Sequence, residues 1–246
     1  MSLNRIFSLI KRNVVASQLG VRFGRSASFR LPKSILLHGR RHILKLPDEN
    51  GVKVAFIDLL LDDCYGCHAL KRSSAQIKTV LDIGGNVGLF CLAARNVFPD
   101  AIIHTYEPNR QLEEYLANQA ESADFNYFME AVGFDDGMIS LDLNEDSVQT
   151  RSKQNDDGNI PQIAFRKAIE RLGGKVDFLK MDCEGGEWEM FEDKKSWQQI
   201  KHLSMEYHLF KPDQNEQRVK ATIENLGFTI TSFIPIGNFG LLTAKR

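Results

Sequence analysis

The stretch VLDIGGNVG, residues 80–88, decides the fold of this chain of 246 residues. A short, mostly apolar strand runs into a turn with three glycines, and the apolar segment 89–97 that follows predicts a helix. Glycine is required where the backbone takes a positive φ or where a ligand must approach the main chain closely. A strand, a glycine-rich turn and a helix N-terminus in this order predict a nucleotide-type ligand at the turn.

The spacing of these glycines excludes two phosphate-binding patterns. The dinucleotide fingerprint needs glycine at positions 86 and 89, which hold asparagine and leucine, and a P-loop needs Gly-Lys followed by serine or threonine. Gly84, Gly85, Asn86 and Gly88 instead favour a ligand with an amino-acid end, whose carboxylate meets N–H groups beside small residues. Asp82 is expected to compensate the ammonium group of that ligand. A tight turn without a ligand is the alternative.

From residue 79 onward, short apolar strands alternate with helical segments, which is typical of a parallel sheet covered on both faces. Only four residues join the last two strands, too few for a crossover helix, so we expect that pair to be antiparallel. The sequence thus predicts an α/β fold with a mainly parallel, seven-stranded sheet ending in an antiparallel hairpin, which suits a Rossmann-like class I methyltransferase better than a dehydrogenase. The expected strands are 80–83, 102–106, 126–132, 176–182, 203–208, 228–234 and 239–244, the clearest helices are 89–97, 111–121 and 216–226, and the polar stretch 144–159 is expected to be a long loop.

The N-terminal part, residues 1–78, is expected to be a basic extension of the domain at 79–246. Residues 1–47 hold ten lysines and arginines and no acidic residue, although the net charge of the chain is −1. Apolar residues recur there at helical spacing and predict an amphipathic helix. Our preferred interpretation is that this helix packs on the chain's own core. Contact with an anionic substrate or a membrane surface is the second alternative, and a transit peptide is the third. The segments 42–46 and 52–60 flank a turn-rich stretch and predict a β-hairpin. The apolar residues of the helix are Leu3, Ile6, Phe7, Ile10 and Val14.

The compartment of the protein is predicted from the absence of a membrane span and of a signal peptide in the sequence. No apolar run approaches the roughly 20 residues that span a bilayer, and the start does not fit a signal peptide. Four scattered cysteines fit a reducing compartment, so we expect a soluble, cytoplasmic protein. Cys64, Cys67 and His68 match a c-type haem attachment pattern, but haem attachment normally needs export, so we interpret these cysteines as incidental. Tyr65 and His68 are expected near the entrance of the cofactor site.

Glu107 ends the second strand of the sheet, about 20 residues after the glycine-rich turn. Rossmann-type folds place a carboxylate at this offset on the ribose hydroxyls. Glu107 and the following Pro108 are therefore expected at the cofactor, unless Glu107 only caps the helix that follows. Ala131 closes the third strand and is expected to flank the adenine.

The stretch VDFLKMDCEGGE, residues 176–187, carries the second strong pattern. It brings Asp182 and Glu184 to the carboxyl end of a strand, the edge at which open α/β sheets hold their ligands. The next strand ends in Glu206-Tyr207-His208, whose first and third residues share one face. An imidazole with the reference pKa near 6.5 is largely neutral, so His208 is the expected general base, with Asp182 or Glu184 as alternatives.

Together these motifs resemble the FkbM family of methyltransferases, over residues 80–208. The resemblance implies that the glycine-rich turn and Glu107 bind S-adenosylmethionine, and that Lys180, Asp182 and Glu184 line the active site, with Asp182 also near the cofactor. It further implies a hydroxyl acceptor on a sugar, a glycolipid or a secondary metabolite. Glycine stands at 85 where the family usually has alanine, and the family's apolar-x-Leu-Asp stretch is absent at 163–166. The motifs are DIGGNVG (82–88), YEP (106–108), AVG (131–133) before Asp136 and Gly137, KMDCEGGE (180–187) and EYH (206–208).

Several alternatives stay open at this point. A metal-free site is preferred, although Asp182, Glu184 and His208 also suit a divalent magnesium or manganese ion. A non-catalytic module that binds S-adenosylmethionine and a nucleic-acid methyltransferase are the competing functions. A nucleic-acid partner is disfavoured, and the absence of the motif Asn/Asp-Pro-Pro-Tyr argues against an enzyme that methylates the amino groups of bases. Peripheral membrane contact through the basic N-terminus and a homodimer are further candidates.

Overall fold

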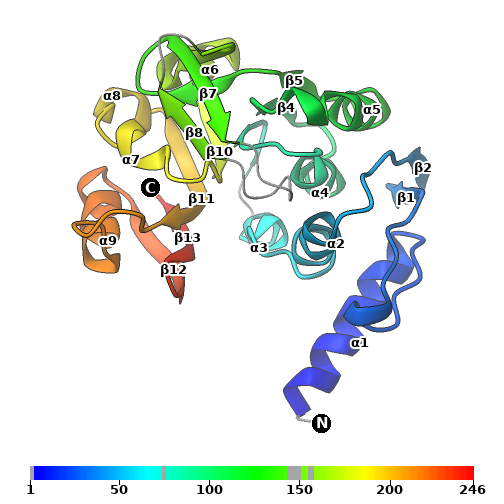
Figure 1. The fold of residues 1–246 in the computed structure, drawn as a ribbon. Coiled ribbons are helices and arrows are strands. Elements are labelled where there is room, and N and C mark those ends of the chain that lie inside the picture. The colour runs from blue at the N-terminus through cyan, green and yellow to red at the C-terminus, as the bar shows by residue number, and fades with distance from the viewer. Residues whose placement is uncertain (1–2, 74–75, 143–150, 155–157) are drawn as a thin grey trace.

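A central sheet of seven strands organises the protein (Figure 1). The computed structural model describes residues 3–73, 76–142, 151–154 and 158–246. In the strand order β12-β13-β11-β10-β3-β4-β5, all neighbouring pairs from β11 to β5 are parallel, and β13 is antiparallel to both of its neighbours. The predicted parallel sheet with a C-terminal antiparallel pair is therefore confirmed. The strands are β3 (Thr79–Ile83), β4 (Ile102–Tyr106), β5 (Asn126–Phe128), β10 (Val176–Met181), β11 (Ile200–His208), β12 (Thr229–Ile236) and β13 (Phe239–Lys245).

Both faces are buried at the centre of this sheet, because neighbouring residues of β3 and of β10 enter different cores. Val80 of β3 and Phe178 of β10 belong to one hydrophobic cluster, while Leu81 and Leu179 belong to another. Helices α4 and α5 cover the first face, and α6 to α9 contribute to the second cluster. The bounds are α4 (Leu89–Val97), a 3₁₀ turn η3 (Arg110–Leu112), α5 (Glu113–Ala123), α6 (Phe165–Arg171), α7 (Glu187–Met190), α8 (Lys194–Trp197) and α9 (Glu216–Asn225).

The chain runs from β3 outward to β4 in one direction and later to β10 on the other side of β3. This reversal makes the carboxyl ends of β3 and β10 the switch point at which such sheets hold their ligands. The glycine-rich turn follows β3, and the acidic stretch 182–187 follows β10, so the fold brings the two strongest sequence motifs to one edge.

A second, four-stranded sheet replaces part of what the sequence predicts as strand and loop. The strand expected over 126–132 is split, because β6 (Ala131–Gly133) leaves the central sheet and pairs with β9 (Ile160–Ala164). Strands β7 (Gly137–Asp142) and β8 (Arg151–Gln154) complete the order β6-β9-β7-β8. The prediction of a loop over 144–159 is wrong at residues 151–154, which form β8. The pairing of β8 with β7 cannot be recognised from the local composition. Residues 143–150 and 155–157 lie outside the described part of the chain.

The hairpin expected over 42–60 is wrong in its position. Residues 50–61 form helix α2 (Asn50–Phe56), which continues as a π-helical turn η2 (Ile57–Leu61). Their buried residues are spaced as on a helix face: Val52, Phe56, Ile57, Leu60 and Leu61. The actual hairpin joins β1 (Ser34–Leu37) and β2 (Arg40–Ile43) through His38 and Gly39. Both turn residues have a positive φ, as a type I′ hairpin turn requires.

Helix α1 (Leu3–Gln18) is anchored at its C-terminal end and projects from the body in Figure 1. Ala16 is fully buried, and the guanidinium of Arg12 bonds the Asp62 carboxylate at 2.5 Å. The expectation that the helix packs its apolar stripe on the core is wrong for Phe7, Ile10 and Val14, whose exposed fractions are 67%, 55% and 52%. Among the described residues, no helix is long and apolar enough to cross a membrane.

The N-terminal extension shares a hydrophobic core with the central sheet. Phe56 and Tyr65 belong to the same cluster as Phe90 of α4 and Phe178 of β10. The segment ends in α3 (Cys67–Arg72), beside α4 in Figure 1. Burial raises the pKa of the Cys67 thiol well above its usual value, so this cysteine behaves as an apolar core residue. The extension therefore contributes packing to the domain that carries the site.

Replacing Phe56 with alanine tests this shared core. We expect the free energy of unfolding to fall by about 3–5 kcal/mol, the usual cost of removing a buried phenylalanine ring. Both tryptophans, Trp188 and Trp197, lie in the central domain, so their fluorescence reports unfolding of that domain during denaturant titration. The substitution should shift this tryptophan transition, whereas Val54→Ala on the exposed side of α2 should leave it in place. An unshifted transition for Phe56→Ala would mean that the extension unfolds independently.

Candidate active site

The turn after β3 can pack against its neighbours only because of its glycines. Gly84 has a φ of 87°, and a Cβ there would lie 1.8 Å from the backbone oxygen of Asp182. A Cβ on Gly85 would lie 2.1 Å from Oγ1 of Thr105. The turn is therefore pressed against the ends of both neighbouring strands, and any side chain at 84 would separate it from β10.

The N–H groups of the turn serve its own shape, which differs from the expectation that they are free for a ligand. Gly84 and Gly85 both donate to the carbonyl of Tyr106, at 3.0 and 2.9 Å. The N–H of Asn86 donates to the Glu107 carboxylate at 2.8 Å. Helix α4 begins directly afterward, and Gly88 at its N-cap gives no side-chain cap. The helix N-terminus is thus the part of this motif that suits the carboxylate of an amino-acid-type ligand.

Asp82 and Lys180 form a buried ion pair beneath the turn. Nζ of Lys180 lies 3.1 Å from Asp82 and donates to the carbonyl of Gly84 at 2.6 Å. Asp82 also accepts from Oγ1 of Thr105 at 2.8 Å. Burial works against the charge on Lys180, but the carboxylates of Asp82 and Asp182 outweigh it and raise the pKa of this lysine above its usual value. The charge of Asp82, expected to meet the ligand's ammonium group, is instead matched by Lys180.

Glu107 connects the turns that follow β3 and β4. Its two carboxylate oxygens accept from the N–H groups of Asn86 and Asn109, each at 2.8 Å. Burial raises the pKa of Glu107 to about 7. The side chain of Asn109, rather than that of Glu107, caps the following 3₁₀ turn by accepting from Gln111. Each Glu107 oxygen keeps a second acceptor position, which a vicinal diol matches.

Pro108 and Ala131 are the other two residues expected at the cofactor. Pro108 follows Glu107 and is partly buried. Ala131 lies in β6, and its side chain packs with Ile139 and Ile160 in the small sheet. The structure therefore gathers the glycine-rich turn, Glu107 and Asp182, whereas Ala131 belongs to a separate cluster.

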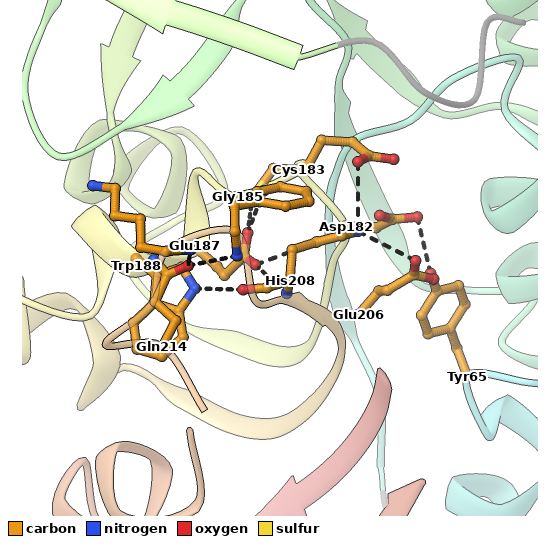
Figure 2. Close-up of polar contacts among 12 residues, drawn as sticks. Tyr65, Asp182, Cys183, Gly185, Glu187, Trp188, Glu206, His208 and Gln214 are labelled. Atoms are coloured by element: carbon orange, nitrogen blue, oxygen red, sulfur yellow. Dashed lines mark hydrogen bonds and ion pairs between the residues drawn. The ribbon is translucent and has the colours of Figure 1, made fainter. Parts of the chain in front are cut away.

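Acidic side chains surround His208 at the carboxyl ends of β10 and β11, as Figure 2 shows. Nε2 of His208 lies 3.5 Å from Glu184 and 3.3 Å from Glu206. Nδ1 lies 3.3 Å from Glu187. Ligand atoms of Asp182, Glu184 and His208 all lie within 4.8 Å of one another, so the three residues combined from sequence meet in space.

Glu187 was not among the expected site residues, whereas Glu206 was expected beside His208 without an assigned role. Glu187 is fully buried and accepts from the backbone N–H groups of His208 and Gly185, at 2.7 and 2.9 Å. Glu206 lies on the same face of β11 as His208, and this spacing of two was the available signal for it. Tyr65, placed only loosely by sequence, donates to Asp182 at 3.1 Å from the N-terminal extension.

The carboxylates keep His208 charged. Burial lowers the pKa of His208, but hydrogen bonds to Glu187 and Glu206 outweigh it and raise this pKa to about 10. The imidazole is therefore protonated at neutral pH in this arrangement, unlike the neutral base expected from sequence. Burial raises the pKa of Glu206, although its bond to His208 opposes that shift. Proton acceptors at this edge are thus the carboxylates.

The chain is similar in sequence to known methyltransferases. Residues 82–230 match the Methyltransferase FkbM domain. Methyltransferase sdnD of Sordaria araneosa is 23% identical over 235 residues, which cover 77% of this chain and 88% of the relative. A SAM-dependent methyltransferase from Aquifex aeolicus is 12% identical, with a TM-score of 0.42 over 77% of this chain and 92% of that one. Aeropyrum pernix fibrillarin with natively bound S-adenosyl-L-methionine is 11% identical, with a TM-score of 0.46 over 71% and 74% of the two chains.

Replacing Glu107 with glutamine should weaken S-adenosylmethionine binding about 10- to 100-fold, because a hydrogen bond to a charged acceptor contributes about 1.5–3 kcal/mol. The affinity of the wild type should rise as the pH increases through about 7, since Glu107 ionises there and the carboxylate is the stronger acceptor. The Glu107→Gln variant should lose that pH dependence. Calorimetric titration at several pH values measures both effects, with Glu121→Gln on the exposed side of α5 as control. Equal affinities for Glu107→Gln and wild type would remove Glu107 from the ribose site.

Proposed function

The chain belongs to the FkbM methyltransferase family and is an S-adenosylmethionine-dependent methyltransferase, and from this premise we propose that it methylates a hydroxyl group of a sugar, a glycolipid or a secondary metabolite. The observation that carries the proposal is the position of the acidic cluster. The backbone of Asp182 packs directly on Gly84, so the acidic cluster lies next to the start of the glycine-rich turn. A hydroxyl acceptor needs such proton acceptors, because it must lose its proton as the new bond forms.

When bound, S-adenosylmethionine supplies a methyl group on a sulfonium: the hydroxyl oxygen forms the new bond to carbon, the carbon–sulfur bond breaks, and S-adenosylhomocysteine leaves. The chain's own residues align the reactants for this in-line displacement, and alignment of this kind contributes up to about 7–11 kcal/mol. Gly84 and Gly85 let the turn pack closely on the neighbouring strand ends, and Glu107 suits the ribose hydroxyls. Lys180 is a positioning residue that fixes the turn through Asp82 and the Gly84 carbonyl.

Carboxylates receive the hydroxyl proton in this proposal. Glu206 is the strongest candidate, since burial raises its pKa and makes it a better base than an ordinary glutamate. His208, already protonated, holds Glu184 and Glu206 at the rim through its Nε2 side. The proton passes from the acceptor oxygen to Glu206 and then to solvent, so that the products are a methyl ether, S-adenosylhomocysteine and one released proton.

The class of acceptor is tested by offering glycans, glycolipids, hydroxylated natural products, RNA, amines and carboxylic acids together with S-adenosylmethionine. We expect S-adenosylhomocysteine and a product heavier by one methylene only with hydroxyl compounds, with fragmentation placing the methyl group on oxygen. Mass spectrometry measures both products. Methylation of nitrogen or of RNA would contradict the proposal, and cofactor binding without turnover on any acceptor would indicate a non-catalytic module.

The Glu206→Gln variant should lower kcat by about 10²- to 10⁴-fold, the usual contribution of a general base. Its affinity for S-adenosylmethionine should stay the same, because Glu206 lies on the acceptor side. In the wild type the rate should fall as the pH drops through the raised pKa of Glu206, since the protonated acid cannot accept the proton. Glu192→Gln, at an exposed position after α7, is the matched control. An unchanged kcat for Glu206→Gln would place the base elsewhere.

A further inference from the structure

Three ligand atoms converge at the acceptor edge of the cofactor turn. One oxygen each from Asp182 and Glu184 and a ring nitrogen of His208 lie within 4.8 Å of one another. An octahedral ion with bonds of about 2.0–2.2 Å holds its ligand atoms about 3 Å apart when adjacent and just over 4 Å apart when opposite. Only a small inward movement of side chains is therefore needed for one ion to reach all three.

The orientation of these ligands is set by other side chains. The fully buried carboxylate of Glu187 contacts Nδ1 of His208 and accepts from its backbone N–H, as Figure 2 shows. Nε2 therefore faces Glu206 and Glu184. Tyr65 donates to one oxygen of Asp182. A carboxylate behind a histidine and a hydrogen-bond donor behind a carboxylate are the partners that orient ligands in metal sites. Both orienting side chains are almost completely buried.

The charge balance of the cluster also favours a cation. Four carboxylates, those of Asp182, Glu184, Glu187 and Glu206, surround one imidazole. The nearby ammonium of Lys180 already pairs with Asp82 and the Gly84 carbonyl. Carboxylates in a partly buried site are costly without a matching positive charge. A divalent ion that replaces the proton on Nε2 of His208 leaves the cluster closer to neutral.

The types of ligand atom indicate which ion the site would bind. Carboxylate oxygens with a single imidazole suit hard divalent ions such as Mg²⁺ and Mn²⁺. The thiol of Cys183 is directed to Glu187, at 3.6 Å, and not to the three converging ligand atoms.

We propose that Asp182, Glu184 and His208 bind one divalent cation, Mg²⁺ or Mn²⁺, which takes the acceptor oxygen as a further ligand. Whereas the sequence alone favours a metal-free site, the converging ligands and their buried orienting partners favour an ion here. Binding of the ion stands on this geometry; its contact with a hydroxyl rests on the proposed function. The ion lowers the pKa of the bound hydroxyl, and Glu206 takes the proton that is released.

Mn²⁺ alone is the probe, added to the full chain after chelator treatment, without S-adenosylmethionine or acceptor. Electron paramagnetic resonance should show one Mn²⁺ per chain with a nitrogen coupling from one imidazole. The Glu184→Gln variant should weaken binding by at least about 100-fold, since changes to outer partners alone cost about 10- to 100-fold. His208→Gln should remove the nitrogen coupling. Glu189→Gln on the exposed face of α7 is the control and should bind like the wild type.

Two results would contradict the proposed cation site. Absence of Mn²⁺ binding at millimolar concentration overturns it, provided that the thermal transition of the wild type is normal. So does binding that Glu184→Gln and His208→Gln leave unchanged, because the ion then lies elsewhere. Glu184 is partly exposed, with 22% of its side chain accessible, so its variant is expected to fold.

Turnover separates this inference from the proposed function. Once a hydroxyl compound that the enzyme methylates has been identified, a chelator should abolish turnover of that compound, and Mg²⁺ or Mn²⁺ should restore it. Turnover that persists in chelator overturns the role of the ion and leaves the hydroxyl proposal standing. If Mn²⁺ binds through Glu184 and His208 while no hydroxyl compound is methylated, the ion site stands and the proposed function fails.

Discussion

The contact between Lys180 and the Gly84 carbonyl is the interaction on which the rest of the site depends. Lys180 and Asp82 are register partners on β10 and β3, and their ion pair lies on the face of the sheet covered by α4. The free end of the lysine turns upward to the first glycine after β3. A buried charge pair of this kind is costly unless all of its polar atoms are used, and here each partner has additional hydrogen bonds. It ties the cofactor turn to the strand that delivers Asp182.

Because of this connection, cofactor turn and acidic cluster are parts of one rigid edge. Gly84 contacts the Asp182 backbone so closely that no Cβ fits between them. The glycine-rich turn and the carboxylates around His208 are then held by the same two strand ends. Charge is distributed in layers at this edge, with the Asp82 and Lys180 pair beneath and the carboxylates around His208 above. The two layers differ in their partners: the lower one bonds the Gly84 carbonyl, and the upper one pairs with His208.

The N-terminal extension closes this edge from the other side. Tyr65 lies over the Lys180 ammonium, at 5.4 Å from the ring centre, and meets the ring of Phe90 edge-on. Its hydroxyl reaches Asp182, so one residue contacts both layers. The extension that surrounds Tyr65 shares its core with α4, which explains how a segment before the sheet can orient a residue after β10. Domain and extension are thus joined at the site itself.

The sequence by itself determined most of the central sheet, the glycine-rich turn and the meeting of Asp182, Glu184 and His208 at one edge. The apolar period of each strand and the short 235–238 connection were sufficient for that, because strand alternation and loop length are local properties. It did not determine the helix at 50–61, where apolar residues on a helix face resemble a strand, nor β8, which depends on pairing with β7. Only the tertiary structure decided the charge of His208, the pairing of Asp82 with Lys180, and the reach of Tyr65 to Asp182. Each depends on groups that are distant in sequence and close in space, because pKa values and ion pairs follow distance and burial, which sequence spacing does not encode.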